Sequence, residues 1–170
     1  MTQSSSYVIA DAAAMETLGA ALAKVIQGGL IIHLNGELGA GKTTLVRGLL
    51  RGLGHAGSVR SPTYTLVEPY ELAGRQIYHL DLYRLGDPEE LEWIGLRDLL
   101  DADSLALIEW PERGRGMLPQ ADLELTLEYF GTGRRVTLTG HSEAGAAVIA
   151  QLDAGSNSAG DLGNDSIHPE

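Results

Sequence analysis

Short apolar runs alternate along the chain with stretches in which apolar residues recur every three or four positions. Residues 30–35 form a mostly apolar run rich in branched side chains, which predicts a buried strand. Residues 44–53 carry apolar side chains with a helical period. Nearer the N-terminus, residues 7–10 are predicted to form a strand and residues 12 to about 27 a helix, with Asp11 as its N-cap.

The same alternation continues through the rest of the chain. Further strands are predicted at 63–71, 76–85, 104–110, 122–129 and 134–139. The turn residues at 73–75 and 131–133 predict two antiparallel hairpins, and the acidic run at 87–90, with proline at its second position, predicts a helix start. These elements indicate a single α/β domain with a mostly parallel central sheet, flanked by helices and extended by antiparallel hairpins.

The segment between the strand at 30–35 and the helix at 44–53 fits the pattern G-x-x-x-x-G-K-[ST]. Glycines at these positions allow successive backbone N–H groups to point at an anion, and the helix N-terminus adds its positive dipole end. We therefore expect a P-loop NTPase domain in which Lys42 reaches the β- and γ-phosphates and the Thr43 hydroxyl binds Mg²⁺. The phosphate-binding residues are predicted to be Gly36, Glu37, Leu38, Gly39, Ala40, Gly41, Lys42, Thr43 and Thr44.

Hydrolysis also requires an acid beside the metal and a group that places the attacking water. Two carboxylates, Asp81 and Glu109, each follow an apolar run that is predicted to be a strand. Spacing alone does not decide which of them meets the metal and which meets the water. Either carboxylate would otherwise be an ordinary solvent-exposed residue at a strand end.

The segment after the P-loop helix contains Ser61, Pro62 and Thr63 at the place where small GTPases keep a mobile switch loop. A serine or threonine hydroxyl here suits a metal contact, although the same residues also suit a plain turn that leads into a strand. No Asn-Lys-x-Asp run, the usual guanine-reading element, occurs in the sequence. ATP is therefore the expected nucleotide.

Composition narrows the setting in which such a site works. The 170 residues include 12 Lys and Arg against 23 Asp and Glu, and no cysteine, which excludes a disulfide framework and thiolate metal sites. There is no apolar run long enough to span a membrane and no basic N-region before an apolar stretch, so we expect a cytoplasmic protein. An acidic surface repels phosphate backbones, so any action on RNA or DNA is expected to go through a partner that holds the nucleic acid.

The C-terminal residues differ in composition from the rest of the chain. A short alanine-rich helix is predicted at 143–152, and Gly, Ser, Asn and Asp dominate from residue 153 onward. The expected organisation is a P-loop ATPase domain at 1–150 followed by a disordered acidic tail at 151–170.

Several runs occur in an order that resembles a known family. They are GELGAGKTT, SPTYTLVEPY, IYHLDLYRL, the Glu-Glu-Leu run at 89–91 and LIEWPER. Together they resemble the TsaE family (older name YjeE), over about residues 7–140. That resemblance implies a Mg²⁺-dependent ATPase of bacterial tRNA threonylcarbamoyladenosine synthesis. It is required for the modification of adenosine 37 in tRNAs that read codons beginning with A. It further implies work with the TsaD–TsaB complex, which ATP hydrolysis resets between turnovers, and contact with tRNA only indirectly, through these partners.

The resemblance also implies roles for matching residues. Residues 36–44 match the Walker A loop, with Lys42 on phosphate and Thr43 on Mg²⁺. Glu109 matches the second acid on the metal side and Asp81 the acid nearest the hydrolytic water. Residues 61–63 match the switch loop.

Two other classes share the P-loop. A small-molecule kinase normally needs a lid with arginines and a pocket for its acceptor, and the residues around Arg113 and Arg115 are more typical of a loop than of a lid helix. A regulatory switch, in which nucleotide binding changes partners and hydrolysis acts only as a timer, fits the small size. The ATPase and the regulatory switch become the same hypothesis if TsaE acts by resetting its partner.

Overall fold

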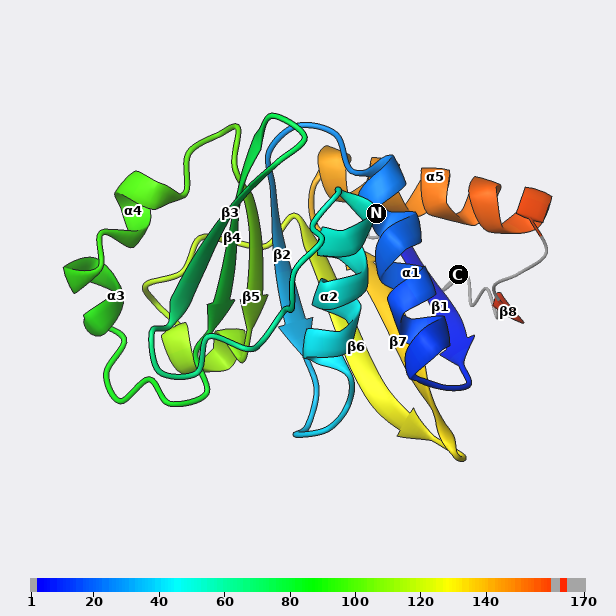
Figure 1. Cartoon of the computed structure of the whole chain (residues 1–170), viewed down its shortest axis with the longest axis horizontal. Helices are drawn as coiled ribbons and strands as arrows, with labels where there is room; N and C mark the ends of the chain where they lie inside the picture. Colours follow the sequence, from blue (N-terminus) through cyan, green and yellow to red (C-terminus); the bar gives the residue numbers. More distant parts are fainter. Residues whose placement is uncertain (1–2, 160–162, 165–170) are drawn as a thin grey trace.

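A computed structural model describes residues 3–159 and 163–164 of the chain. Its strands are β1 (Gln3–Ile9), β2 (Leu30–Asn35), β3 (Val67–Leu72), β4 (Arg75–Asp81), β5 (Leu105–Glu109), β6 (Leu123–Phe130), β7 (Gly133–Gly140) and β8 (Gly163–Asn164). They form one sheet in the order β3-β4-β5-β2-β6-β7-β1-β8 (Figure 1). The central strands β4, β5, β2 and β6 are parallel, and every outer pairing is antiparallel. The predicted fold class is confirmed.

Three longer helices pack around the half of the sheet that contains β2, β6 and β7. They are α1 (Ala12–Val25), α2 (Lys42–Gly52) and α5 (Glu143–Ala159). In Figure 1, α1 and α2 lie side by side across the sheet. Glycines permit this close approach, since a Cβ on Gly19 would lie 2.2 Å from the Leu45 carbonyl oxygen and one on Gly48 would lie 2.2 Å from that of Glu16. The helix that follows the P-loop is therefore fixed against its neighbour at backbone distance.

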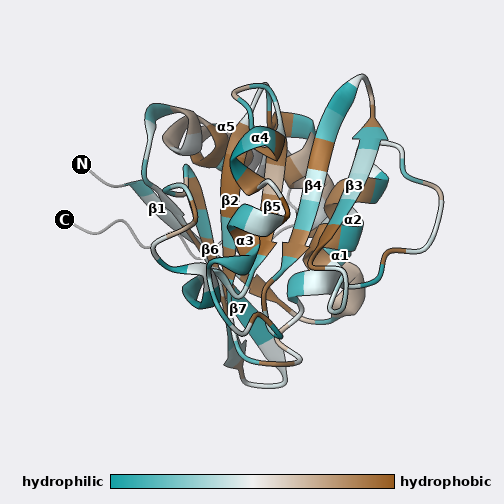
Figure 2. Ribbon diagram, turned by 90° about the vertical axis from the view of Figure 1, so that its left-hand side faces the viewer, coloured by the Kyte–Doolittle hydropathy of each residue, from teal (hydrophilic) through white to brown (hydrophobic). Residues whose placement is uncertain are grey.

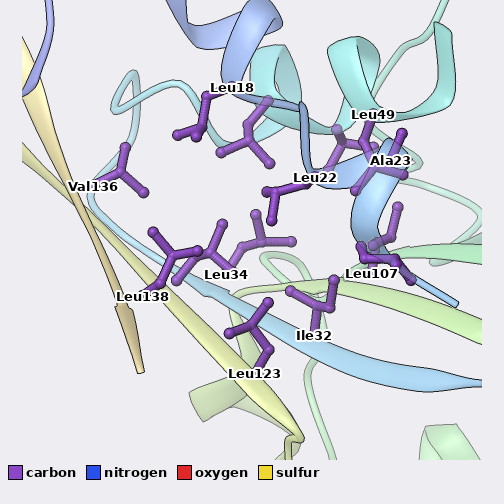
Figure 3. Close-up of a cluster of buried hydrophobic side chains, with 14 of the residues drawn as sticks. Leu18, Leu22, Ala23, Ile32, Leu34, Leu49, Leu107, Leu123, Val136 and Leu138 are labelled. Atoms are coloured by element: carbon purple, nitrogen blue, oxygen red, sulfur yellow. The ribbon is translucent and has the colours of Figure 1, made fainter. Parts of the chain in front are cut away.

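The main hydrophobic core lies between these helices and the sheet. Figure 3 shows Leu18 and Leu22 of α1 and Leu49 of α2 directed toward Ile32 and Leu34 of β2. All five side chains are buried. Ile77 of β4 and Leu105 and Leu107 of β5 also belong to this core. Because alternate residues of a strand point to opposite faces, the residues between them pack in a second hydrophobic cluster.

That second cluster covers the opposite face of β4 and β5. Leu80, Ala106 and Ile108 pack there with Leu91 of α3 (Glu90–Trp93) and Leu96 of α4 (Leu96–Leu99). In Figure 2 these two short helices lie in front of strands that are largely hydrophobic. The 3₁₀ helix η1 (Pro111–Gly114) follows β5. Odd-numbered residues of β4 and β5, including Asp81 and Glu109, therefore face α2 rather than this cluster.

The largest departure from the predicted elements concerns the C-terminal segment. The disorder predicted from residue 153 onward is wrong for residues 153–159, because α5 continues to Ala159. Asp153 anchors the helix to the sheet by accepting hydrogen bonds from the hydroxyls of Ser5 and Tyr7 in β1. Strand β8 also pairs with β1. Residues 160–162 and 165–170 of the predicted tail lie outside the described residues.

The other elements differ from prediction at their ends. The helix predicted to reach residue 27 ends at Val25, and the strand predicted from residue 63 begins at Val67. Leu66, just before β3, has φ of 67°, which an extended strand does not accommodate. Residues 61–63 consequently belong to the loop between α2 and β3.

His33 in β2 is expected to make the stability of the protein depend on pH. Its Nε2 is buried and has no hydrogen-bond partner among the residues that the structure describes. Burial lowers the pKa of His33 from 6.5; the His141 charge adds to this, and Glu124 and a Pro119 backbone hydrogen bond oppose it. The unfolded chain thus binds this proton more readily, so stability falls as the pH drops from 6.5 through the lowered pKa. We expect His33→Gln to lessen the loss of stability between about pH 7 and pH 5, as measured by urea unfolding at each pH. Parallel pH profiles for the two proteins would contradict this assignment.

Candidate active site

The P-loop leaves β2 at Gly36 and enters α2 at Lys42 through a turn that glycines make possible. Gly39 and Gly41 have φ of 80° and 105°, in the left-handed region that side chains with a Cβ disfavour. A Cβ on Gly41 would also lie only 3.0 Å from Cε of Met15 in α1. The loop therefore has the strand, glycine turn and helix arrangement that the sequence predicts for a phosphate site.

Lys42 is the first residue of α2 and is only 5% exposed. Its ammonium donates a hydrogen bond to the Gly36 carbonyl oxygen and lies 3.6 Å from the centroid of the Trp110 ring. Burial lowers the pKa of Lys42, and the nearby carboxylates of Glu109, Glu112 and Asp81 oppose that shift. The cation is thus held inside the loop, close to acidic groups and partly removed from water.

Glu109 lies beside the P-loop because β5 is the immediate neighbour of β2, with Leu34 and Glu109 in register. The Thr43 hydroxyl lies 3.0 and 3.1 Å from its two carboxylate oxygens. His79 Nε2 lies 2.6 Å from Glu109 Oε2. The carboxylate of Glu109 is therefore fixed from two sides, by the first turn of α2 and by β4.

Asp81 lies one strand further from the loop and is in register with Glu109. One of its oxygens accepts a hydrogen bond from the Ser61 hydroxyl, and the other accepts one from the Tyr83 backbone N–H at 3.0 Å. The Thr63 hydroxyl lies 3.4 Å from that of Ser61. The predicted switch loop is thus tied to the acid of β4 and not to the acid of β5.

A cavity of about 290 Å³ joins these parts. Its lining residues are Leu38, Gly39, Ala40, Gly41, Lys42, Thr43, Thr44, Ser61, Thr63, Asp81, Tyr83, Glu109 and Trp110. Of the predicted site residues, Gly36, Glu37 and Pro62 are not among them. Gly36 still contributes through the carbonyl oxygen that Lys42 contacts, whereas Glu37 and Pro62 shape the loops that carry their neighbours.

Three residues of this site were not among the predicted ones. Trp110 and Tyr83 line the cavity with their ring centroids 5.0 Å apart, and His79 supports Glu109 from behind. His79 precedes Asp81 by two positions on one strand, so the period of two already places both side chains on one face. Periodicity does not mark Trp110, although it stands directly after Glu109 in the LIEWPER run; its backbone adopts φ of 57° after β5.

A second hollow, of about 310 Å³, adjoins the other side of the P-loop. It shares Gly39, Ala40, Gly41 and Thr44 with the first and extends over Ala10, Asp11, Met15, Thr132 and Arg134. The Arg134 guanidinium donates a hydrogen bond to the Gly39 carbonyl oxygen at 3.1 Å, and the Tyr129 hydroxyl donates one to that of Leu38 at 2.7 Å. The β6–β7 hairpin thus supports the outer wall of the loop.

The oxygen atoms beside the cavity suit a hard divalent cation. Mg²⁺ takes oxygen ligands, commonly one or two from protein together with waters and substrate phosphates. The Thr43 hydroxyl and the Glu109 carboxylate provide such a pair, within hydrogen-bond distance of each other. Within the described residues no group of three or more His, Cys, Asp or Glu forms a metal cage. This arrangement fits a metal that arrives with a nucleotide rather than one held by protein alone.

Comparison with known proteins places this geometry in a family. Residues 9–137 match the family model described as threonylcarbamoyl adenosine biosynthesis protein TsaE. The chain belongs to the TsaE family. The Haemophilus influenzae protein named tRNA threonylcarbamoyladenosine biosynthesis protein TsaE is 54% identical over 121 residues, which are 71% of this chain and 77% of that protein. A Streptomyces coelicolor protein of the same name is 40% identical over 150 residues, 83% of this chain and 100% of that one.

A solved structure supports the fold of this TsaE family member. The crystal structure of YdiB from Bacillus subtilis superposes with a TM-score of 0.79 and covers 92% of this chain and 99% of its own. Its sequence is 24% identical, so the likeness concerns the fold alone. Separately, no helix among the described residues is long and apolar enough to cross a membrane.

Proposed function

We propose that this protein is a Mg²⁺-dependent ATPase of tRNA threonylcarbamoyladenosine biosynthesis that acts with the TsaD–TsaB complex and resets it between turnovers. The observation that carries this proposal is the convergence of Lys42, Thr43, Asp81 and Glu109 on one cavity. Relatives that carry the name of this pathway supply the biological setting.

Each residue has a chemical task in the proposed reaction, in which water attacks the γ-phosphorus and the bond to the bridging oxygen of ADP breaks. The backbone N–H groups of residues 39–44 and the Lys42 ammonium would hold the phosphates and oppose their charge. Thr43 and Glu109 would hold Mg²⁺, which supplies electrostatic stabilisation of the phosphate oxygens when bound. Asp81 would orient the attacking water and accept a hydrogen bond from it, with Ser61 steadying the carboxylate.

The hollow beside Ala10, Thr132 and Arg134 is the place for the nucleoside of the bound nucleotide. It continues from the P-loop on the side away from Asp81 and Glu109, so a nucleotide can lie across both hollows with its phosphates over the loop. ATP is proposed over GTP because the sequence lacks the guanine-reading Asn-Lys-x-Asp element.

The electrostatics of the cavity support a need for a partner. Among the described residues that line it, Lys42 is the only basic side chain. Arg84 and Arg113 do not line it; their guanidinium groups lie 5.0 Å from the centroid of the Tyr64 ring and 5.7 Å from that of the Tyr83 ring. An arginine on the developing charge is commonly worth roughly 10³–10⁵ in the rate of P-loop enzymes. A partner surface is the natural source of that charge and of closure.

We therefore expect the isolated protein to hydrolyse ATP slowly, well below about one turnover per second. The TsaD–TsaB complex should change the rate at least about tenfold, because it completes the charge distribution around the γ-phosphate. Release of phosphate from ATP is measured with and without the complex, at several salt concentrations. Charge screening, over about 10 Å at 0.1 M salt, should weaken the association. Turnover at tens per second by the protein alone, or association independent of salt, would contradict the proposal.

Two assays separate this function from the alternatives that share a P-loop. Phosphate release without any added acceptor favours an ATPase over a kinase. A partner reset that needs ATP binding but not hydrolysis favours a pure switch, and a non-hydrolysable ATP analogue tests it directly. The switch reading draws support from the loop at Ser61, whose side chain contacts the acid proposed to orient water.

A further inference from the structure

The segment that carries α3 and α4 combines two unusual surface properties. We define residues 86–103 as the acidic lobe. It contains seven acidic side chains and one basic one, Arg97, and so carries more than half of the net charge of −11. Six of the seven acids are exposed. Within this acidic surface the side chain of Trp93 is 80% exposed and that of its neighbour Ile94 is 36% exposed.

The lobe presents Trp93 on a defined backbone rather than on a loose loop. Glu90 Oε2 accepts from the backbone N–H of Gly86 at 3.1 Å, and Asp87 Oδ1 accepts from that of Glu89 at 3.0 Å. After Trp93 the chain turns at Gly95, whose φ of 73° is in the left-handed region. A large exposed aromatic side chain has only two χ angles and so loses little conformational entropy on binding, and tryptophan is common among the residues that dominate interface affinity.

A groove of about 270 Å³ lies in the same lobe and is lined by Glu92 and Gly95, which are close to Trp93 in the sequence. The buried side chains of Leu91 and Leu96 and the partly buried Met117 line it. The exposed residues around them are the acids Glu92 and Asp98 and one base, Arg97. An apolar centre surrounded by a polar rim is typical of a protein–protein interface, and the groove has both parts.

We infer that the acidic lobe is the docking surface for a protein partner that presents basic side chains around an apolar contact. The inference rests on the proposed function, in which that partner is the tRNA-handling TsaD–TsaB complex. Charge complementarity supports this occupant, since a protein that binds tRNA carries Lys and Arg. RNA itself and a second copy of this chain are both acidic and are repelled by the lobe.

The lobe is also placed to affect the nucleotide site. Leu91 and Leu96 pack in one cluster with Leu82, which follows Asp81, and Ile108, which precedes Glu109. Trp110, which lies under the Lys42 ammonium, packs against the same cluster. A partner seated on the lobe thus lies over the layer of buried side chains that packs behind both acids.

The test measures the dissociation constant of the full-length protein for purified TsaD–TsaB by titration calorimetry. Trp93→Ala should raise it at least about tenfold, the size expected for a central aromatic contact. Trp93→Phe should retain most of the affinity. Because Trp93 is exposed and does not line the cavity at the P-loop, partner-free ATP turnover should not change. Phe130→Ala, which removes an aromatic that is 43% exposed at the β6–β7 hairpin, is the matched control and should bind like the wild type.

A second variant tests the charge. Glu92→Gln combined with Asp98→Asn should weaken binding at low salt and reduce its salt dependence, whereas Glu143→Gln on α5 should do neither. Wild-type affinity in Trp93→Ala would overturn the inference and leave the proposed function standing. No binding of TsaD–TsaB by the wild type would overturn both. Trp93-dependent binding of free tRNA, or Trp93-dependent self-association, would also overturn the inference, because the occupant would be a different one.

Discussion

Lys42→Ala is expected to abolish ATP turnover, with a loss of at least about 10³-fold, while the protein stays folded. Its ammonium is the only basic group among the described residues that line the cavity, and only 5% of Lys42 is exposed. Its removal leaves the charge that develops on the phosphates without a cation. Phosphate release under saturating ATP measures the effect.

The same substitution should leave the fold intact for a physical reason. Burial lowers the pKa of Lys42, which means that the folded chain tolerates the charge at a cost. Alanine is also a good residue in the first turn of α2. We expect the melting temperature to stay within about 4 °C of the wild type, the shift that 1 kcal/mol produces in a domain of this size. Lys24→Ala, at an exposed position of α1, is the matched control. Near-normal hydrolysis by folded Lys42→Ala would remove the P-loop from the mechanism.

The P-loop was predictable because its signal is local. The strand, the glycine turn and the helix are adjacent in sequence. The strand and the helix are each indicated by the spacing of apolar residues, and the turn by its glycines. The structure places Gly39, Gly41 and Lys42 as that pattern predicts. The chemical roles of these residues stay a prediction until turnover is measured.

The arrangement of the two acids was not predictable from spacing, since it depends on the order of strands in the sheet. Asp81 and Glu109 both end apolar runs, and either strand can lie next to β2 as far as the local pattern is concerned. The order β4-β5-β2 places Glu109 directly beside the loop and Asp81 one strand away. Contacts between distant parts of the chain also account for the roles that the sequence analysis missed. His79 contacts Glu109 of another strand, and Asp153, in the part of α5 beyond its predicted end, accepts hydrogen bonds from Ser5 and Tyr7 of β1.

The register of the two acids leads to the last expected result, that their substitutions differ in kind. Glu109 is bound to Thr43 and His79, on the side of the proposed metal, so Glu109→Gln should weaken the Mg²⁺ dependence and the nucleotide affinity together. Asp81 is bound to Ser61, so Asp81→Asn should lower kcat about 10²–10³-fold with binding little changed, as for an interaction made mainly in the transition state. Both amides keep the shape of the side chain, remove its charge and replace one acceptor oxygen by an NH2 donor. Nucleotide titrations at several Mg²⁺ concentrations, alongside steady-state kinetics, separate the two effects.

Glu71→Gln, an exposed change in β3, is the control for loss of one negative charge. Equal losses of affinity in the two variants would refute this division of labour, and a reversed pattern would exchange the roles of the two carboxylates.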